Sequence, residues 1–324
     1  MSASERRLRF LCPPDAKGLT VAKALHDAAG LSHADAKGIV ASGLARVNGT
    51  TTTRADHRLS PGDVVEASWD PARRYKAPRA AALKGPGFRV VHEDDDVAVV
   101  EKAPGVLTVP APTDKGISLL ERLEHHYRKR GLKGISLEAV HRIDRYTSGL
   151  VAFARHGAAR AALRSEFARG RPERVYLAVV EGRLDKDRGR LEHRLAENPK
   201  SLKVHTVPEG AEGRDAACTY RVLERFTDAT LVEVRLETGR RNQIRVQFAA
   251  VGHPLVGDVA YGRPSPRIAR VALHAYRLGF ASPSGKSLVF QSEPPRDFRE
   301  LLAALRRPPD EPVRPRRAPA RRYR

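Results

Sequence analysis

Short apolar runs, separated by turn-forming residues, constrain the fold of this 324-residue chain more than any other feature. Such runs are typical of β-strands; three stretches with helical periodicity lie between them and a fourth follows the last one. The predicted strands cover residues 97–100, 150–154, 175–180, 230–234 and 271–275, and the predicted helices cover residues 118–129, 158–169, 243–251 and 297–305. Strands outnumber helices and neighbouring strands can form hairpins. We therefore expect an α+β fold over residues 88–305, with a mostly antiparallel mixed sheet flanked by helices.

The first 70 residues are predicted to form a separate, small α+β domain. Thr20 opens a helix with one apolar face, and Ser32 suits the N-cap of a second helix. GLARVNG (43–49) then predicts a helix stop, a short strand and an Asn-Gly turn, and PGDVVEA (61–67) predicts a turn and a further strand. Residues 71–87, rich in Pro, Ala and cations, are expected to be a linker. Residues 306–324 are expected to be a disordered basic tail, either attracting phosphates or without function.

The charge of the chain indicates a polyanionic partner. Lys and Arg number 59 against 38 Asp and Glu, a net charge of +21. Nucleic acid is the usual partner of so basic a protein, although solubility or an anionic membrane surface would also explain the charge. The two cysteines, Cys12 and Cys218, are too far apart in sequence and too few to indicate a disulfide framework or a Cys-rich zinc site. With neither a secretory signal nor a long apolar run, we expect a cytoplasmic protein without a membrane span.

The segment HRIDRYTSGLVAFAR (141–155) places one carboxylate among cations, on a predicted turn just before a strand. Arg142 and Arg145 flank Asp144, and positive charge nearby favours an ionised carboxyl, so its pKa should lie below about 3.9. Asp144 is then a poor general acid at neutral pH, but it suits a nucleophile or an anion beside a developing cation. A surface ion pair, or an Asp that caps the turn, would explain the same residues.

Further segments contain chemically capable side chains. Tyr176 lies in the apolar run ERVYLAVVEG, where a tyrosine is more often a core residue than a catalytic one. In ETGRRNQIR (237–245), a glycine turn precedes a cationic helix start. Arg245 of this segment either reaches a carboxylate through a bidentate pair or is an exposed helix residue. The segments GHPLVGDVAYG (252–262) and LHAYRLGF (273–280) predict a turn-rich loop and a strand.

Taken together and in this order, these segments resemble the RluA-type RNA pseudouridine synthases. HRIDRYTSGL is similar to the aspartate motif of that family, VYLAVVEG to its tyrosine motif and LETGRRNQIRV to its arginine motif. The resemblance extends over about residues 88–300, including EDDDVAVVEKAPGVLTVP near its start. In the N-terminal region, GLARVNG and PGDVVEA resemble the S4 RNA-binding domain, although a generic α+β domain without an RNA role remains an alternative.

The resemblance implies that Asp144 is the catalytic aspartate, that Arg245 pairs with it, and that Tyr176 stacks on the base and takes the C5 proton. It implies RNA contacts by Arg142, Arg145, Arg240 and Arg241. Arg142 would fill the gap left by the target base and Arg145 would hold a phosphate. The reaction requires no cofactor and no metal. The chain departs from the family pattern at Asn242 and Gln247, where histidines are common, and at Tyr146, which is often acidic.

The expected partner is therefore RNA, with ribosomal RNA favoured over tRNA, and the expected protein is a monomer. A non-catalytic RNA-binding or ribosome assembly factor would keep the same fold, but the presence of Asp144, Tyr176 and Arg245 argues against it. A glycosidase usually needs two carboxylates. Glu233 and Glu237 are the nearest candidates for a second one by pattern, and we interpret both as structural.

Overall fold

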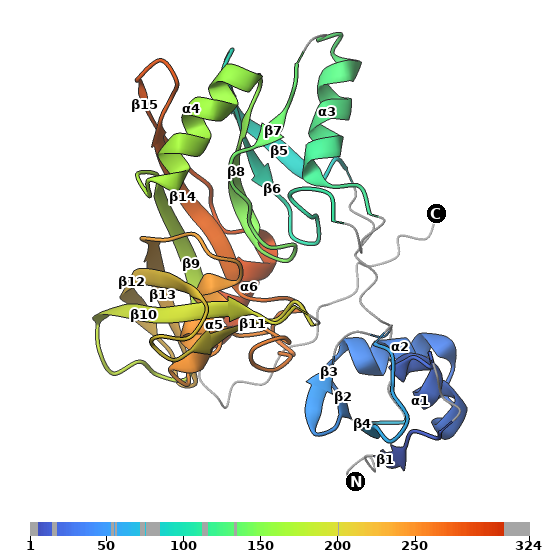
Figure 1. Cartoon of the computed structure of the whole chain (residues 1–324). Coiled ribbons are helices and arrows are strands. Elements are labelled where there is room, and N and C mark those ends of the chain that lie inside the picture. Colours follow the sequence, from blue (N-terminus) through green and yellow to red (C-terminus); the bar gives the residue numbers. More distant parts are fainter. Residues whose placement is uncertain are drawn as a thin grey trace, which may run out of the picture.

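The computed structural model describes residues 6–14, 18–52, 55, 57–71, 75, 85–111, 116–132, 135–199 and 201–307. These residues form two units, each built around its own sheet (Figure 1). The N-terminal unit has four strands in the order β1-β4-β2-β3, and the larger unit has an eleven-stranded sheet. The predicted tail from residue 308 onward lies outside the described residues, as do most residues of the predicted linker.

The N-terminal unit packs two helices against its sheet. Thr20 caps the first helix by accepting a hydrogen bond from the Lys23 N–H, and Ser32 caps the second helix as predicted. Asn48 and Gly49, both with positive φ, form the predicted tight turn of a hairpin. The elements are β1 (Arg6–Leu11), α1 (Val21–Ala29), α2 (His33–Ala41), β2 (Ala45–Val47), β3 (Thr50–Thr52) and β4 (Val64–Trp69). The sequence pattern missed β1, because arginines interrupt its apolar residues.

The core of this unit continues beyond residue 70, which corrects the predicted start of the linker. Tyr75 is buried together with Trp69 in the N-terminal apolar cluster. Its hydroxyl accepts a hydrogen bond from the Asp70 backbone N–H at 2.8 Å. The Pro-rich composition around Tyr75 concealed this anchoring aromatic residue.

The large sheet confirms the predicted α+β class. Its strand pairs are antiparallel except for β14 and β8, so the sheet is mixed. The main order is β11-β10-β12-β13-β9-β14-β8-β6-β5, with β15 paired to β14 and β7 to β8. The strands are β5 (Phe88–Glu93), β6 (Val97–Lys102), β7 (Glu138–Ala139), β8 (Ser148–Ala154), β9 (Glu173–Glu181), β10 (Arg188–Glu197), β11 (Val204–Val207), β12 (Arg214–Arg225), β13 (Ala229–Leu236), β14 (Leu273–Ala281) and β15 (Ser287–Gln291).

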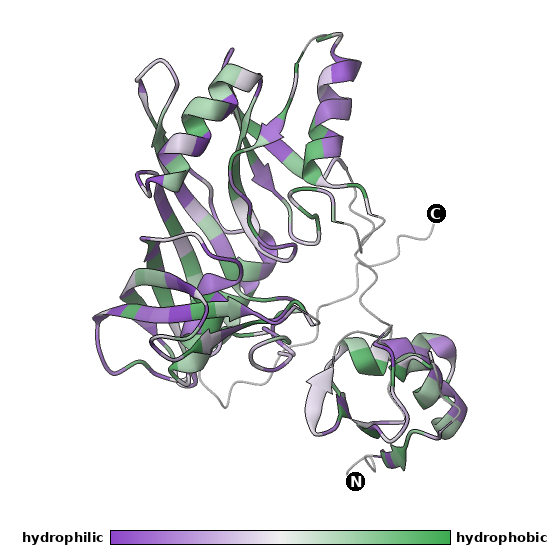
Figure 2. Cartoon of the chain, viewed as in Figure 1, coloured by the Kyte–Doolittle hydropathy of each residue, from purple (hydrophilic) through white to green (hydrophobic). Residues whose placement is uncertain are grey.

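Helices cover both faces of this sheet, which explains why its central strands are continuous apolar runs. Residues of α3 (Leu119–Lys129) and α5 (Gln243–Ala250) share one apolar cluster with Val151 and Phe153 of β8. Residues of α4 (Gly157–Ala168) pack on the opposite face with Leu150 and Ala152, and α6 (Arg296–Leu305) packs against β9 from that face. Figure 2 shows hydrophobic and hydrophilic residues interleaved along these helices and strands. All seven residues of β8 are buried, so it forms a rigid base for the turn that precedes it.

Candidate active site

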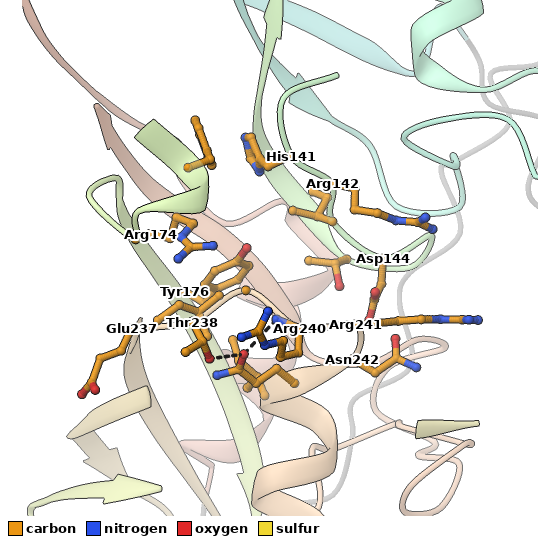
Figure 3. A pocket seen from close by; sticks show the side chains of 18 of the residues that line it. His141, Arg142, Asp144, Arg174, Tyr176, Glu237, Thr238, Arg240, Arg241 and Asn242 are labelled. Atoms are coloured by element: carbon orange, nitrogen blue, oxygen red, sulfur yellow. Dashed lines mark hydrogen bonds between the residues drawn. The ribbon is translucent and has the colours of Figure 1, made fainter. Parts of the chain in front are cut away.

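A pocket of about 800 Å³ opens where the turn before β8 meets β9 and the start of α5 (Figure 3). The described structure brings most of the predicted site residues together in this pocket. Its lining includes Asp144, Tyr176, Arg245, Arg142, Arg240 and Arg241. Arg145 is not among the lining residues, because its Nε donates to the Gly105 carbonyl at 3.0 Å. The pocket therefore combines two carboxylates, Asp144 and Glu237, with one phenol and several cations.

The turn between β7 and β8 presents Asp144 to this pocket. The Thr147 N–H donates to the Asp144 carbonyl at 3.1 Å and closes the turn. Gly149 follows at φ 112°, and a Cβ atom there would lie 2.2 Å from the Ala275 carbonyl oxygen. Only glycine fits this backbone conformation and this close approach of β8 to β14. The glycine of the TSGL sequence is thus required by the local backbone.

Three buried polar side chains hold the same turn from the protein interior, and sequence reasoning missed all of them. Each donates to a different carbonyl of the turn, so these buried acceptors are satisfied. The donor and acceptor pairs are Thr108 Oγ1 to Ile143 O at 2.8 Å, Lys102 Nζ to Arg145 O at 2.9 Å and Arg270 Nη1 to Tyr146 O at 3.1 Å. The backbone on both sides of Asp144 is therefore fixed.

Lys102 is the most unusual of the three, because its side chain is fully buried. Its Nζ also donates to the carbonyls of Ala103 at 3.0 Å and Val106 at 2.8 Å, so all three ammonium protons can be used. Burial lowers the pKa of Lys102 to about 7, and the negative charge of Asp144 opposes that shift. A lysine at the end of an apolar strand is a weak sequence signal, since many strands end in an exposed lysine.

Arg245 joins two carboxylates in the pocket. Its Nη1 lies 3.1 Å from Asp144 Oδ2, which fits the predicted pair. Its Nε and Nη2 each lie 2.7 Å from an oxygen of Asp258, whose side chain is fully buried. Burial opposes the charge of Arg245, but the hydrogen bonds and charge of Asp258, together with Asp144, raise its pKa above the ordinary value. The bidentate partner is thus Asp258 of the turn-rich segment, and Asp144 receives one remaining N–H.

Tyr176 and His141 flank the approach to Asp144 (Figure 3). Burial raises the pKa of the Tyr176 phenol to about 12, so it is protonated at neutral pH. His141 Nε2 accepts a hydrogen bond from the Ala152 N–H at 3.0 Å, and its ring stacks on Phe167. Burial lowers the pKa of His141 to about 3, so the ring is neutral and serves as a wall of the site.

The cations of the pocket differ in how firmly they are held. Arg142 is exposed at the pocket. Arg240 Nε donates to the Asp215 carbonyl at 3.0 Å, and Arg241 forms an ion pair with Glu197. Arg174, which sequence reasoning missed, also lines the pocket. Together these side chains give the pocket a strongly positive rim, suited to a polyanion.

Asn242 and Gln247, the two departures from the expected pattern, have different surroundings. Asn242 adopts a left-handed conformation, and its Oδ1 accepts a hydrogen bond from Arg245 Nη1 at 3.3 Å. Gln247 is fully buried and donates to the carbonyls of Leu191 and Ala216 at 3.0 and 2.9 Å. Asn242 therefore touches the site, whereas Gln247 fixes α5 to the sheet. Glu237, the second carboxylate of the pocket lining, forms an ion pair with Arg190.

Within the described ranges, no group of three or more His, Cys, Asp or Glu side chains is arranged to hold a metal ion. Among the helices of that same part of the chain, none has the length and apolar character needed to cross a membrane.

Comparison with known proteins identifies the family of this chain. Residues 96–250 match the family of RNA pseudouridylate synthases. An uncharacterized RNA pseudouridine synthase of Aquifex aeolicus is 31% identical over 285 residues, which cover 83% of this chain and 88% of the relative. The ribosomal large subunit pseudouridine synthase D of Zymomonas mobilis is 35% identical over 231 residues, covering 67% and 73% of the two chains.

Comparison with solved structures shows the same fold. Human RNA pseudouridylate synthase domain containing 4 superposes with a TM-score of 0.57 at 20% sequence identity, covering 67% of this chain and 92% of that chain. The chain belongs to the RNA pseudouridine synthase family. It is an isomerase that modifies RNA, as the sequence motifs predicted.

Proposed function

We propose that the protein converts uridine to pseudouridine at specific sites of large-subunit ribosomal RNA, with Asp144 as the catalytic residue. The observation that carries the proposal is the Asp144 carboxylate in the pocket, bound by Arg245 and close to the Tyr176 phenol, whereas Glu237 of the same lining is paired with Arg190. The reaction breaks the N1–C1′ bond, rotates the uracil ring and rejoins it through C5. Asp144 either attacks C1′ or removes the 2′ proton to form a glycal, and both routes require the ionised carboxylate.

Arg245 and Tyr176 take complementary parts in this proposal. Arg245 keeps Asp144 charged and aimed, because a guanidinium held by Asp258 retains a fixed N–H for it. Tyr176 stacks on the uracil ring and takes the C5 proton after the ring rejoins. Because the phenol is protonated at neutral pH, Tyr176 takes the C5 proton only while it passes its own hydroxyl proton to water, so that the phenol is neutral before and after the transfer.

The target uridine must leave its base stack to enter the pocket, at a cost of a few kcal/mol. Exposed Arg142 is placed to occupy the gap, and Arg240 and Arg241 to contact the backbone. Arg145 remains a candidate phosphate ligand only from outside the pocket, since its Nε is bound to the Gly105 carbonyl. The chain needs no cofactor for this redox-neutral rearrangement.

The N-terminal unit supports a structured RNA as substrate. Its order of two helices and a hairpin with an Asn-Gly turn fits the S4-like RNA-binding domain that the sequence resembles. Relatives from Zymomonas mobilis and Nitrosomonas europaea are named as large-subunit ribosomal enzymes, which favours ribosomal RNA over tRNA.

A pseudouridine map of total RNA tests this proposal. Cells without the protein are compared with cells complemented by the wild type or by Asp144→Asn. We expect sites in large-subunit RNA to disappear and only the wild type to restore them. If tRNA sites disappear instead, the substrate is tRNA and the choice of ribosomal RNA is wrong. An unchanged map together with altered growth would indicate that the chain acts as a binding factor.

A further inference from the structure

Arg174 differs from the other arginines of the pocket. Its residue is only 8% exposed, and its Nε has no hydrogen-bond partner. Within the described part of the chain, no Asp or Glu forms an ion pair with it, whereas Arg241 has one such partner and Arg245 has two. A buried cation without a partner is costly, and such a group in a native structure requires an explanation, one of which is a bound anion.

The nearby positive charge of Arg240 increases the free-energy cost of burying Arg174. Burial lowers the pKa of Arg174, the Tyr176 phenol opposes the shift, and the charge of Arg240 lowers the pKa further. Two guanidinium groups thus lie near each other on one wall of the pocket. Like charges in a poorly solvated place repel, and an anion bound between them would remove the repulsion.

The geometry of β9 brings Arg174 near the position that we propose for the target base. Arg174 and Tyr176 are two residues apart on β9, so their side chains lie on the same face, about 7 Å apart along the strand. Figure 3 shows the Arg174 guanidinium beside the Tyr176 ring. A nucleotide whose uracil stacks on Tyr176 can place its own phosphate near Arg174.

We infer that Arg174 binds the phosphate of the target uridine or of its direct neighbour, and thereby determines how deeply the nucleotide enters the pocket. This inference rests on the proposed stacking of the uracil on Tyr176. Guanidinium groups bind phosphate through paired, charge-assisted hydrogen bonds, and the partner-free Arg174 has donors available for them.

A substitution at Gly239 can also displace the Arg174 side chain. A Cβ atom at Gly239 would lie 2.3 Å from Arg174 Nη1. The arginine therefore rests against a backbone that has no side chain, and alanine there would push the guanidinium away without changing any charge. The cost to the fold is small, because the clash is with the end of a flexible side chain.

The test uses the full chain and a transcript of large-subunit ribosomal RNA. Arg174→Met keeps an apolar stem and removes the charge, Arg174→Lys keeps the charge, and Arg128→Met removes one charge from exposed α3 as a matched control. We expect Arg174→Met to lower kcat/KM about 10- to 100-fold, mainly through KM. Its binding should depend less on salt, with the slope smaller by about one, and Arg174→Lys should retain the slope.

Two further measurements separate this role from a structural one. Arg174→Met should melt at the wild-type temperature or above it, since no partner is lost, whereas a structural arginine would lower the melting temperature. Gly239→Ala should impair the wild type but add nothing to Arg174→Met. An unchanged salt slope, or additive losses in the double variant, would overturn the inference.

A wrong choice of substrate can be distinguished from a wrong role for Arg174. If the wild type leaves the transcript unmodified, the ribosomal proposal fails. The salt slopes of wild type and Arg174→Met on oligouridine then decide the phosphate contact, with equal slopes counting against it.

Discussion

Asp258 accepts two hydrogen bonds of 2.7 Å from Arg245, whereas Asp144 accepts one of 3.1 Å from the same guanidinium. The side chain of Asp258 is fully buried and that of Asp144 is 25% exposed. Asp258 therefore determines the orientation of Arg245, and Arg245 in turn orients the Asp144 carboxylate that lines the pocket. The backbone N–H groups of Ala260 and Tyr261 also donate to Asp258 and hold it in place.

Asp258→Asn tests whether Asp258 orients Arg245 and, through it, Asp144. The amide keeps the size of the carboxyl but removes the charge that fixes Arg245. We expect kcat to fall about 100-fold, because a displacement of about 1 Å in a catalytic group has effects of that size. The free energy of unfolding should decrease by about 3 kcal/mol, since a buried ion pair loses one partner. Single-turnover kinetics and denaturant unfolding measure the two quantities. Activity within twofold of wild type would show that Asp144 alone positions Arg245.

Lys102→Met tests the support behind the catalytic turn. The substitution removes the Nζ donor from three carbonyl groups, of which that of Arg145 still accepts from the Gly105 N–H, and it also removes a buried charge. These effects on stability oppose each other. We expect the melting temperature to change little and kcat to fall about tenfold or more, with KM nearly unchanged, because the turn that carries Asp144 loosens.

Lys102→Arg serves as the companion variant for this test. It keeps the charge but places a larger group in a site with no free space, so it should not restore kcat. Wild-type kcat in Lys102→Met would contradict the role of Lys102 as a positioning residue.

The residues of the candidate site could largely be predicted from sequence, whereas the residues that support them could not. Asp144, Tyr176 and Arg245 lie in local motifs, and the structure brings them into one pocket. Lys102 and Asp258 act across long sequence separations, and each would be an ordinary surface residue by local pattern alone. Their roles depend on burial, which is determined by the packing of the complete sheet.

The same reasoning explains which strands were predicted. Strands buried on both faces, such as β8 and β9, are continuous apolar runs and were found. β10 was missed because its sequence, RGRLEHRLAE, alternates buried and exposed positions and contains many charged residues. The linker prediction erred at Tyr75 because a single aromatic contact overrides a Pro-rich composition.

Tyr176→Phe separates stacking from proton transfer. The phenyl ring keeps the buried surface of the tyrosine and removes only the hydroxyl. We expect RNA affinity within about threefold of wild type and a decrease in kcat of about 10²- to 10⁴-fold, the usual contribution of a general base. Ultraviolet titration should also show one tyrosinate fewer above pH 11, because burial raises the pKa of Tyr176 to about 12. An unchanged kcat would assign Tyr176 to stacking alone.

His141 should contribute to stability in a pH-dependent way and not to the chemical step. Burial lowers its pKa to about 3 in the folded protein, against about 6.5 when unfolded. Between these values the unfolded chain binds one more proton, so the free energy of unfolding falls as pH decreases from 6.5 toward 3. The slope reaches about 1.4 kcal/mol per pH unit for this one group. The contribution of neutral His141 to the free energy of unfolding is fully present above pH 6.5.

His141→Gln removes this titration and can still accept the hydrogen bond from the Ala152 N–H. Denaturant unfolding at several pH values should therefore show a shallower decrease for the variant than for the wild type. His274, whose pKa burial also lowers, remains in both proteins and its effect cancels in the difference. The pH profile of kcat between 6 and 8 should have the same shape in both proteins, because a neutral His141 transfers no proton. A kinetic pKa near 6.5 that disappears in His141→Gln would instead place this histidine among the groups that titrate during catalysis.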